Sequence, residues 1–434
     1  MVNTREIALD CIMEIMEKKQ YSHYVMKQVL DKYGYLEKQE RSFIKRVTEG
    51  TVERCIEMDY IIDAFSKVPV RKMKPLIRSL LRISVYQLLY MDGTPDSAVC
   101  NEAVKLAAKR GFSSLKGFVN GVLRTIARNR DRIAYPDPHK EPEGYLSVAY
   151  SMPLWIVTMW ISRFGREKTE LILKGLLSER PVTVRFDENL SGAEKEKLLR
   201  EMKASGIEAK QTQELPYAYR LKNTDRIETI PGFAQGKIAV QDLGSMAIIE
   251  TADIQKDQIV IDVCGAPGGK AIHAAQKLNH TGFVTIRDLS ERKVALTEEN
   301  IARSGCDNIR AEVCDATVPD QNSIEKADLV IADLPCSGLG VIGRKPDIKY
   351  RVTKQDIASI AALQQKILGT VWRYVKPGGK LLYSTCTLTE AENEDNMAWF
   401  TERFPFEKIK ERTFFPGIDP TDGFYTALLV RKAE

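Results

Sequence analysis

Residues 259–270 have the sequence IVIDVCGAPGGK, an apolar run followed by an acid and a glycine-rich turn. The run Ile259–Val263 has the length and the β-branched content of a buried strand. The turn ends where a helix is predicted to begin, over Lys270–Leu278. A strand, a glycine turn and a helix in this order are typical of the ligand-binding edge of a parallel sheet.

The same alternation continues toward the C-terminus. Further strand cores are predicted at Phe283–Ile286, Ile309–Val313, Asp328–Ala332 and Lys380–Tyr383. Helices are predicted at Glu291–Ser304, Lys354–Val375 and Thr389–Phe404, the last opened by a capping box of Thr389 and Glu392. Alternating strands and helices indicate a doubly wound, mostly parallel, Rossmann-like sheet, which we assign to residues 236–434.

Two other domains are predicted before this sheet. Residues 1–133 are predicted to be all-helical, with one clear break at Asp92–Asp96. A proline-rich linker, 135–144, separates them from a small α+β module over residues 145–235. The expected fold is therefore multidomain, with an all-α front, an α+β middle and an α/β end.

Composition limits the class of protein. Apolar residues make up 44% and charged residues 28% of the 434 residues, as in ordinary globular proteins. No apolar run is long enough for a membrane span, and the amphipathic N-terminus does not resemble a signal peptide. The eight cysteines form no CxxC pair and there are four histidines, so we expect no metal site and a reducing cytoplasm.

Positive charge is concentrated at the front of the chain. Residues 1–133 hold 24 Lys and Arg against 16 Asp and Glu, whereas the remainder holds 40 against 43. Helical spacing places two sets of basic residues on helix faces: Arg71, Lys74, Arg78 and Arg82, and Arg124, Arg128 and Arg132. These faces are either solvated surface or phosphate-contacting surface, whose affinity would fall with salt.

The glycine turn predicts a cofactor site. Its members are Cys264, Gly265, Ala266, Pro267, Gly268, Gly269 and Lys270. Glycine lets the backbone approach a ligand, and the following helix presents free N–H groups. The spacing is not GxGxxG and Pro267 removes a donor, so a nucleoside without a pyrophosphate suits the turn better than a dinucleotide.

Acids at the ends of the next strands extend this site. Asp288 lies where an acid pairs with ribose hydroxyls in such folds, and Asp315 lies where an adenine edge could be bound. For each acid the alternative is a turn or a helix cap.

Two cysteines end later strands and have polar neighbours. Cys336 closes the segment Ala332–Cys336, which contains Asp333, and Cys386 closes Tyr383–Cys386. A thiolate that adds to C6 of a pyrimidine makes C5 nucleophilic, so that C5 can accept a methyl group while an acid supports the charge at N3. A second group must then help to release the enzyme. Residue chemistry alone leaves open which thiol attacks.

These motifs resemble those of the RNA cytosine-5 methyltransferases. The resemblance covers residues 240–434 and is carried by Cys264–Lys270, Asp333–Asp347, Lys376–Cys386 and Thr421–Tyr425. The helical front, Arg5–Arg130, is similar to the RNA-binding NusB domain. The chain departs from the family pattern at Gly265, where alanine is commoner, and at Ala271-Ile272, where hydroxyl residues are common.

The resemblance implies a role for each site residue. Cys386 would be the nucleophile, Cys336 would assist release, and Asp333 would hold cytosine N3 and could touch the cofactor. The residues that would bind S-adenosyl-L-methionine are Cys264, Gly265, Ala266, Pro267, Gly268, Gly269, Lys270, Asp288, Asp315 and Asp333. The NusB-like front implies 16S rRNA as the substrate.

Three alternatives remain at this point. An RNA-binding or antitermination factor would explain the NusB-like front but not the paired cysteines. The same chemistry on tRNA differs only in its substrate, and a dinucleotide-dependent oxidoreductase is disfavoured by Pro267. No membrane and no obligate protein partner are expected, and the protein is predicted to be monomeric.

Overall fold

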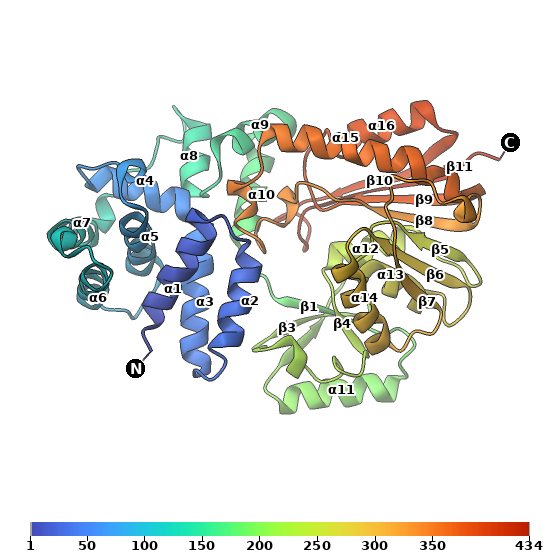
Figure 1. Ribbon diagram of the computed structural model, residues 1–434, viewed down its shortest axis with the longest axis horizontal. Coiled ribbons are helices and arrows are strands. Elements are labelled where there is room, and N and C mark those ends of the chain that lie inside the picture. Colours follow the sequence, from blue (N-terminus) through green and yellow to red (C-terminus); the bar gives the residue numbers. More distant parts are fainter. Residues whose placement is uncertain (1, 434) are drawn as a thin grey trace. The chain divides into compact units, whose positions relative to one another are not determined.

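A computed structural model describes residues 2–433 (Figure 1). Met1 and Glu434, which begin and end the first and last predicted domains, lie outside the described residues. The chain divides into two compact units. The helical unit runs to Ser178 and includes Ile342–Arg351, and the catalytic unit holds Glu179–Val341 and the chain from Val352 onward.

The helical unit is built almost entirely from amphipathic helices. They are α1 (Thr4–Ile12), α2 (Ser22–Lys32), α3 (Lys38–Glu53), α4 (Cys55–Phe65), α5 (Pro75–Tyr90), α6 (Asp96–Lys109), α7 (Lys116–Arg128), α8 (Pro142–Ala149), α9 (Leu154–Phe164) and α10 (Arg166–Leu177). The apolar faces of α1–α7 form one core around α5, whose residues Ile77, Leu80, Leu81 and Val85 are buried. The break predicted at Asp92–Asp96 separates α5 from α6.

The first predicted basic face does not lie on a single helix. Arg71 is in a short 3-10 turn, Val70–Lys72, and Lys74 precedes Pro75, the first residue of α5. Proline is favoured at a first helical position because its missing N–H has no partner there.

The two arginines that do lie on α5 are paired inside the helical unit. Arg78 forms an ion pair with Glu17, and Arg82 forms two hydrogen bonds of 2.7 Å with Asp59. Arg82 is 8% exposed. The prediction that these two arginines contact phosphate is therefore wrong, because acids from other helices already pair with them inside the unit. In contrast, Arg124, Arg128 and Arg132 are exposed.

The catalytic unit begins with a small four-stranded sheet. Its strands are β1 (Val182–Phe186), β2 (Glu208–Gln211), β3 (Ala218–Lys222) and β4 (Ile238–Val240), in the order β2-β3-β1-β4. All neighbours are antiparallel, and α11 (Gly192–Ala204) packs on the sheet through Leu198 and Met202. The predicted module, residues 145–235, also includes α9 and α10, which group with the helical unit by their contacts.

A seven-stranded sheet forms the rest of this unit. Its strands are β5 (Ile259–Asp262), β6 (Phe283–Asp288), β7 (Ile309–Val313), β8 (Ala327–Asp333), β9 (Val375–Thr385), β10 (Phe406–Phe414) and β11 (Phe424–Arg431). The order is β10-β11-β9-β8-β5-β6-β7. The strands β5 to β9 are mutually parallel, whereas β11 is antiparallel to both of its neighbours, β9 and β10.

Helices cover both faces of this sheet (Figure 1). On one face, α15 (Lys354–Val371) and α16 (Glu394–Arg403) bury Val330 and Leu381. On the other, α12 (Leu243–Thr251) and α13 (Gly269–Lys277) bury Leu329 and Leu382, and α14 (Glu291–Ser304) lies on the same side. Adjacent residues of one strand thus enter opposite cores, which explains the continuous apolar runs in the sequence.

The predicted capping box at Thr389 and Glu392 is wrong. The helix begins at Glu394, and Glu392 is fully buried. The Thr389 hydroxyl does donate to the Glu392 carboxylate, but that carboxylate also accepts from Ser337, beside Cys336. A tertiary partner thus replaced the local cap. Across residues 2–433, the helices all fall short of the length and apolar content that a membrane span requires.

Candidate active site

Five neighbouring parallel strands bring the predicted site residues to one edge of the sheet. In spatial order, β9 is followed by Cys386, β8 ends at Asp333, β5 leads into the glycine turn, β6 ends at Asp288, and β7 is followed by Asp315. The chain reverses its winding direction between β8 and β5. A crevice opens at such a switch point in doubly wound sheets, so the glycine turn and Asp333 flank the expected ligand position.

The two predicted cysteines lie against each other. Their sulfurs are 3.1 Å apart, longer than the ~2.05 Å of a disulfide. The hydrogen bond to Cys386, together with burial, raises the pKa of Cys336 well above its ordinary value. Burial and this contact therefore favour the protonated form of Cys336, whose sulfur also accepts the backbone N–H of Cys386 at 3.3 Å.

Asp333 is held by two side chains. Its Oδ2 accepts from Lys270 Nζ at 2.7 Å, and its Oδ1 accepts from the Ser384 hydroxyl at 2.7 Å. Burial alone lowers the pKa of Lys270, but the Asp333 carboxylate more than offsets this and leaves that pKa raised. Lys270 comes from the start of α13 and Ser384 from β9, so three elements fix one carboxylate whose side chain remains 32% exposed.

Asp262, the last residue of β5, was not among the predicted site residues. It is fully buried, and among the residues the structure describes neither carboxylate oxygen has a hydrogen-bond partner. Burial, helped by the Asp333 charge, raises the pKa of Asp262 to about 8. Its position directly before the glycine turn was the one sequence signal that could have identified it.

The glycine turn has the shape that a close backbone approach requires. A Cβ on Gly265 would lie 2.5 Å from the Asp262 carboxyl group and 2.8 Å from Ile286, so alanine would force a shift here. A Cβ on Gly269 would meet no atom within 4 Å, which leaves this helix start open to a ligand. The close approach of the Asp262 carboxyl group therefore explains why this chain has glycine at 265, where the family more often has alanine.

The remaining predicted acids also make local contacts. Asp288 is 8% exposed, and its carboxylate accepts from the Ser290 N–H at 3.0 Å and from Lys293 at 3.3 Å. Asp315 accepts from both the backbone and the hydroxyl of Thr317, and these bonds lower the pKa of Asp315. Both acids thus make the turn contacts that the alternative interpretation expected.

Two residues that the sequence analysis missed position the loop that carries Cys336. Glu392 accepts hydrogen bonds from the backbone and the hydroxyl of Ser337. Gly340 donates to the Cys386 carbonyl at 3.0 Å, and a Cβ there would lie 2.1 Å from the Gly423 carbonyl oxygen. The loops of both cysteines are therefore fastened together by groups far apart in sequence.

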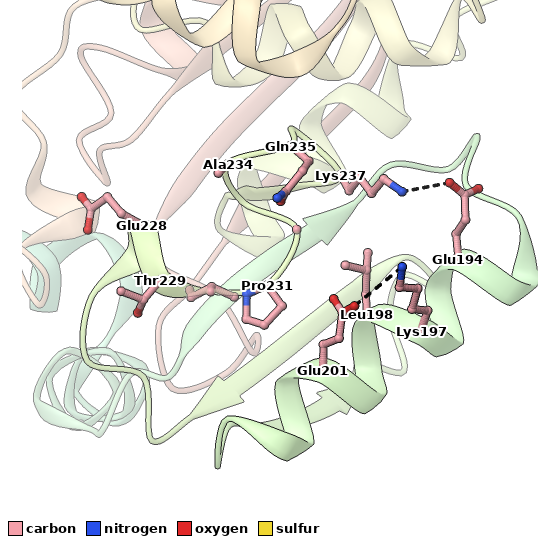
Figure 2. Close-up of a pocket in the computed structure, with 12 residues that line it drawn as sticks. Glu194, Lys197, Leu198, Glu201, Glu228, Thr229, Pro231, Ala234, Gln235 and Lys237 are labelled. Atoms are coloured by element: carbon pink, nitrogen blue, oxygen red, sulfur yellow. Dashed lines mark hydrogen bonds and ion pairs between the residues drawn. The ribbon is translucent and has the colours of Figure 1, made fainter.

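Two other polar clusters in the catalytic unit contain internal ion pairs. A cavity of about 350 Å³ beside α11 contains none of the predicted site residues, and its charges form the ion pairs Lys237–Glu194 and Lys197–Glu201 (Figure 2). Glu188, Glu250 and His273 bring three potential metal-ligand atoms within 4.8 Å of one another. Lys277 forms ion pairs with both of these carboxylates, at 2.9 and 2.5 Å.

The crevice fits a cationic nucleoside. Three acids, Asp262, Asp288 and Asp333, end neighbouring strands at this edge; Lys270 pairs with Asp333 and Lys293 with Asp288, and the Asp262 oxygens have no hydrogen-bond partner among the described residues. This edge on a doubly wound sheet defines the class of S-adenosylmethionine-dependent methyltransferases.

Comparison with known proteins identifies the family. The family model described as 16S rRNA methyltransferase RsmB/F matches residues 249–430, the NusB family model matches 2–128, and the ferredoxin-like domain of RsmF/B-like methyltransferases matches 152–228. "Probable ribosomal RNA small subunit methyltransferase B" of Bacillus subtilis is 36% identical over 407 residues, which cover 93% of this chain and 89% of that protein. The Synechocystis protein of the same name is 30% identical, with 99% of both chains covered.

The fold agrees with this result. The crystal structure of PH0851 matches with a TM-score of 0.81 at 24% identity and covers 99% of both chains. The chain belongs to the RsmB/F family of 16S rRNA methyltransferases. The predicted NusB-like front, α+β middle and Rossmann-like catalytic fold are confirmed, and so is the predicted cofactor, S-adenosylmethionine.

Proposed function

We propose that the protein methylates C5 of a cytosine in 16S rRNA through a temporary bond between Cys386 and C6 of the base. The observation that carries this proposal is the pair of sulfurs 3.1 Å apart at the ends of adjacent parallel strands, beside a fixed carboxylate. An RNA-binding factor without chemistry would have no need of two thiols in this position.

The protonation of the thiol pair supports distinct roles for the two cysteines. The raised pKa of Cys336 favours its protonated form, and the position of Cys386 after β9 matches the nucleophile of the family that the motifs resemble, so we assign the bond to C6 to Cys386. The electrons of the C5–C6 double bond then move through C4 to N3, which gains one proton as the Cys386 thiol loses one, and the Asp333 carboxylate accepts a hydrogen bond from the N3–H. Lys270 and Ser384 hold that carboxylate in one orientation while charge develops.

The remaining steps restore the enzyme. When bound, S-adenosylmethionine would supply the methyl group from its sulfonium to C5 and would leave as S-adenosylhomocysteine. The C5 proton then passes to a general base, N3 gives up its added proton, and the electrons of the Cys386–C6 bond return to sulfur as the ring regains its aromaticity. Cys336 assists this release. The residues that hold the cofactor are those of the glycine turn, Cys264–Lys270, with Asp288, Asp315 and Asp333.

The target base must leave its stack to reach two sulfurs at a strand edge. Such chemistry acts on an unpaired or extruded nucleotide, so a loop or bulge of the rRNA is the expected substrate.

Bisulfite sequencing of 16S rRNA tests the function. Cells that lack the protein should lose resistance to conversion at one cytosine, and the wild-type gene should restore it. A gene that encodes Cys386→Ser should fail to restore it. Resistance at the same cytosine with the Ser variant would exclude the proposed nucleophile.

A further inference from the structure

The start of α2 carries an exposed aromatic cluster that the proposed chemistry does not use. We define the aromatic cluster as Tyr21, His23 and Tyr24. Tyr21 is 51% and Tyr24 is 40% exposed, and His23 is exposed between them. The rings of His23 and Tyr24 are 4.2 Å apart, and those of Tyr21 and Tyr24 are 6.0 Å apart. Most large apolar side chains of this unit are buried in its core, so a group of exposed rings requires an explanation.

The aromatic cluster is held in place by the segment Ile342–Arg351. The Ser22 N–H and hydroxyl both donate to the buried Asp347 carboxylate. The Arg351 guanidinium lies 4.2 Å from the centre of the Tyr21 ring and also donates to Asp347 at 3.0 Å. Rings fixed in this way lose little conformational freedom when a ligand binds.

That segment is itself anchored in the core of the helical unit. Lys349 is 2% exposed, and its Nζ donates to the Glu53 carbonyl at 2.7 Å. The Tyr350 hydroxyl donates to the Val52 carbonyl at 2.8 Å. In sequence, the segment begins six residues after Cys336, so it continues the loop that carries the second thiol.

Positive charge lies near the rings. Residues 18–28 contain three lysines and neither Asp nor Glu, although Lys18 forms an ion pair with Glu14, and Arg344 and Lys345 are exposed on the anchoring segment. Burial lowers the pKa of His23, and the Lys345 and Arg351 charges lower it further against the opposing Asp347 charge, so the neutral ring is favoured. Neutral rings beside lysine and arginine match the chemistry of a nucleic acid, with bases that stack and phosphates that need cations.

We infer that the aromatic cluster binds unpaired nucleotides of the RNA substrate by stacking, while Lys345 and neighbouring lysines contact the phosphates. This inference rests on the proposed function, because it assigns a second contact to the same RNA. Single-stranded RNA is favoured over duplex because only splayed bases offer their faces to side chains.

Fluorescence anisotropy on the full-length protein tests the inference. The probe is a short fluorescein-labelled single-stranded RNA, compared with the same strand annealed to its complement. The double variant Tyr21→Ala/Tyr24→Ala should bind the single strand at least ~5-fold more weakly and the duplex equally well. The variant Tyr21→Phe/Tyr24→Phe should keep wild-type affinity.

Two controls separate stacking from charge and from misfolding. Tyr35→Ala removes a tyrosine that is 71% exposed but lies outside the aromatic cluster, and it should leave affinity unchanged. Lys345→Gln should reduce the slope of log affinity against log salt by about 0.7, a slope that the tyrosine variants should not alter. The melting temperature of each variant reports on the fold.

Equal binding by the Ala and wild-type proteins would overturn the inference, as would an equal loss on single strand and duplex. Failure of the proposed function would look different. In that case wild-type protein would bind RNA through the aromatic cluster but would methylate no cytosine.

Discussion

Cysteines lie both in the helical unit and at the carboxyl edge of the seven-stranded sheet, but their surroundings differ. Cys11 lies in the apolar core of the helices and Cys55 is buried near the paired charges of Arg82 and Asp59; burial raises the pKa of Cys55 to about 12. Cys336 and Cys386 instead face each other at strand ends, beside a carboxylate that lysine and serine hold.

Charged groups show the same contrast. In the helical unit, Arg82 is buried and donates two hydrogen bonds to the Asp59 carboxylate. At the sheet edge, Asp262 is buried with two unpartnered oxygens among the described residues. Residue type alone therefore does not decide whether a buried charged group is paired; its neighbours in the tertiary fold do.

The largest expected effect comes from exchanging a thiol in each region. Cys386→Ser should reduce methyl transfer to rRNA by at least about 10⁴-fold, because the hydroxyl is a poor nucleophile toward C6. Cofactor affinity, measured by calorimetry, should change by less than about twofold. Cys55→Ser should keep its activity and lower the melting temperature, since a buried hydroxyl replaces a thiol. A Cys386→Ser enzyme that turns over normally would remove the distinction between the regions.

Loss of the Cys336 thiol should cause a covalent protein–RNA adduct to accumulate. Cys336→Ala should slow turnover by about 10²-fold or more, because Cys336 no longer assists release of the methylated base from Cys386. A protein–RNA adduct should then persist on a denaturing gel. The control is the double variant with Cys386→Ser, which should give no adduct. Free protein alone from the single variant would show that Cys336 has no part in release.

The paired arginines should contribute to stability and not to RNA binding. Arg82→Ala should lower the free energy of unfolding by about 3 kcal/mol, because Asp59 loses its bidentate partner beside a buried site. The matched control, Arg128→Ala on the exposed face of α7, should change stability by less than about 0.5 kcal/mol and reduce the salt slope. Urea titration and RNA binding at several salt concentrations measure both. A reduced salt slope for Arg82→Ala would restore the predicted phosphate-contacting face.

The smallest difference is expected between the two strand-end acids. Asp288→Ala should weaken S-adenosylmethionine binding about tenfold, through loss of a charge-assisted hydrogen bond to the ribose. Asp315→Ala should weaken it by less than about twofold, because Thr317 already occupies that carboxylate. Calorimetry with the intact protein compares them, and equal losses would show that both acids contact the cofactor.

Local patterns predicted the sheet well. The helix over Glu291–Ser304 has the predicted bounds, because Ser290 caps its start and Gly305 ends it in a left-handed conformation. The strand β7 also has its predicted bounds, and its alternating apolar and charged residues are typical of a strand with one face in solvent. The site residues at strand ends followed from the same patterns.

Contacts between distant segments could not be predicted in this way. The side chain of Glu392 has a hydroxyl three residues before it, yet it binds Ser337, 55 residues away in sequence. Helical spacing placed Arg78 and Arg82 on one face but could not show that Glu17 and Asp59 cover it. Periodicity gives the direction of a side chain, and only the tertiary fold supplies its partner.

The segment Ile342–Arg351 has a practical consequence for dissecting the protein. The chain passes between the two units at 178–179, at 341–342 and again at 351–352, so neither unit is one continuous stretch. Deletion of the NusB-like front would remove the backbone carbonyls that accept hydrogen bonds from Lys349 and Tyr350. A lysine that is buried in the full chain would then lose its partner. The methyltransferase part of the chain therefore cannot be separated by a single cut. A fusion of this part to another protein would have to include or redesign the segment Ile342–Arg351.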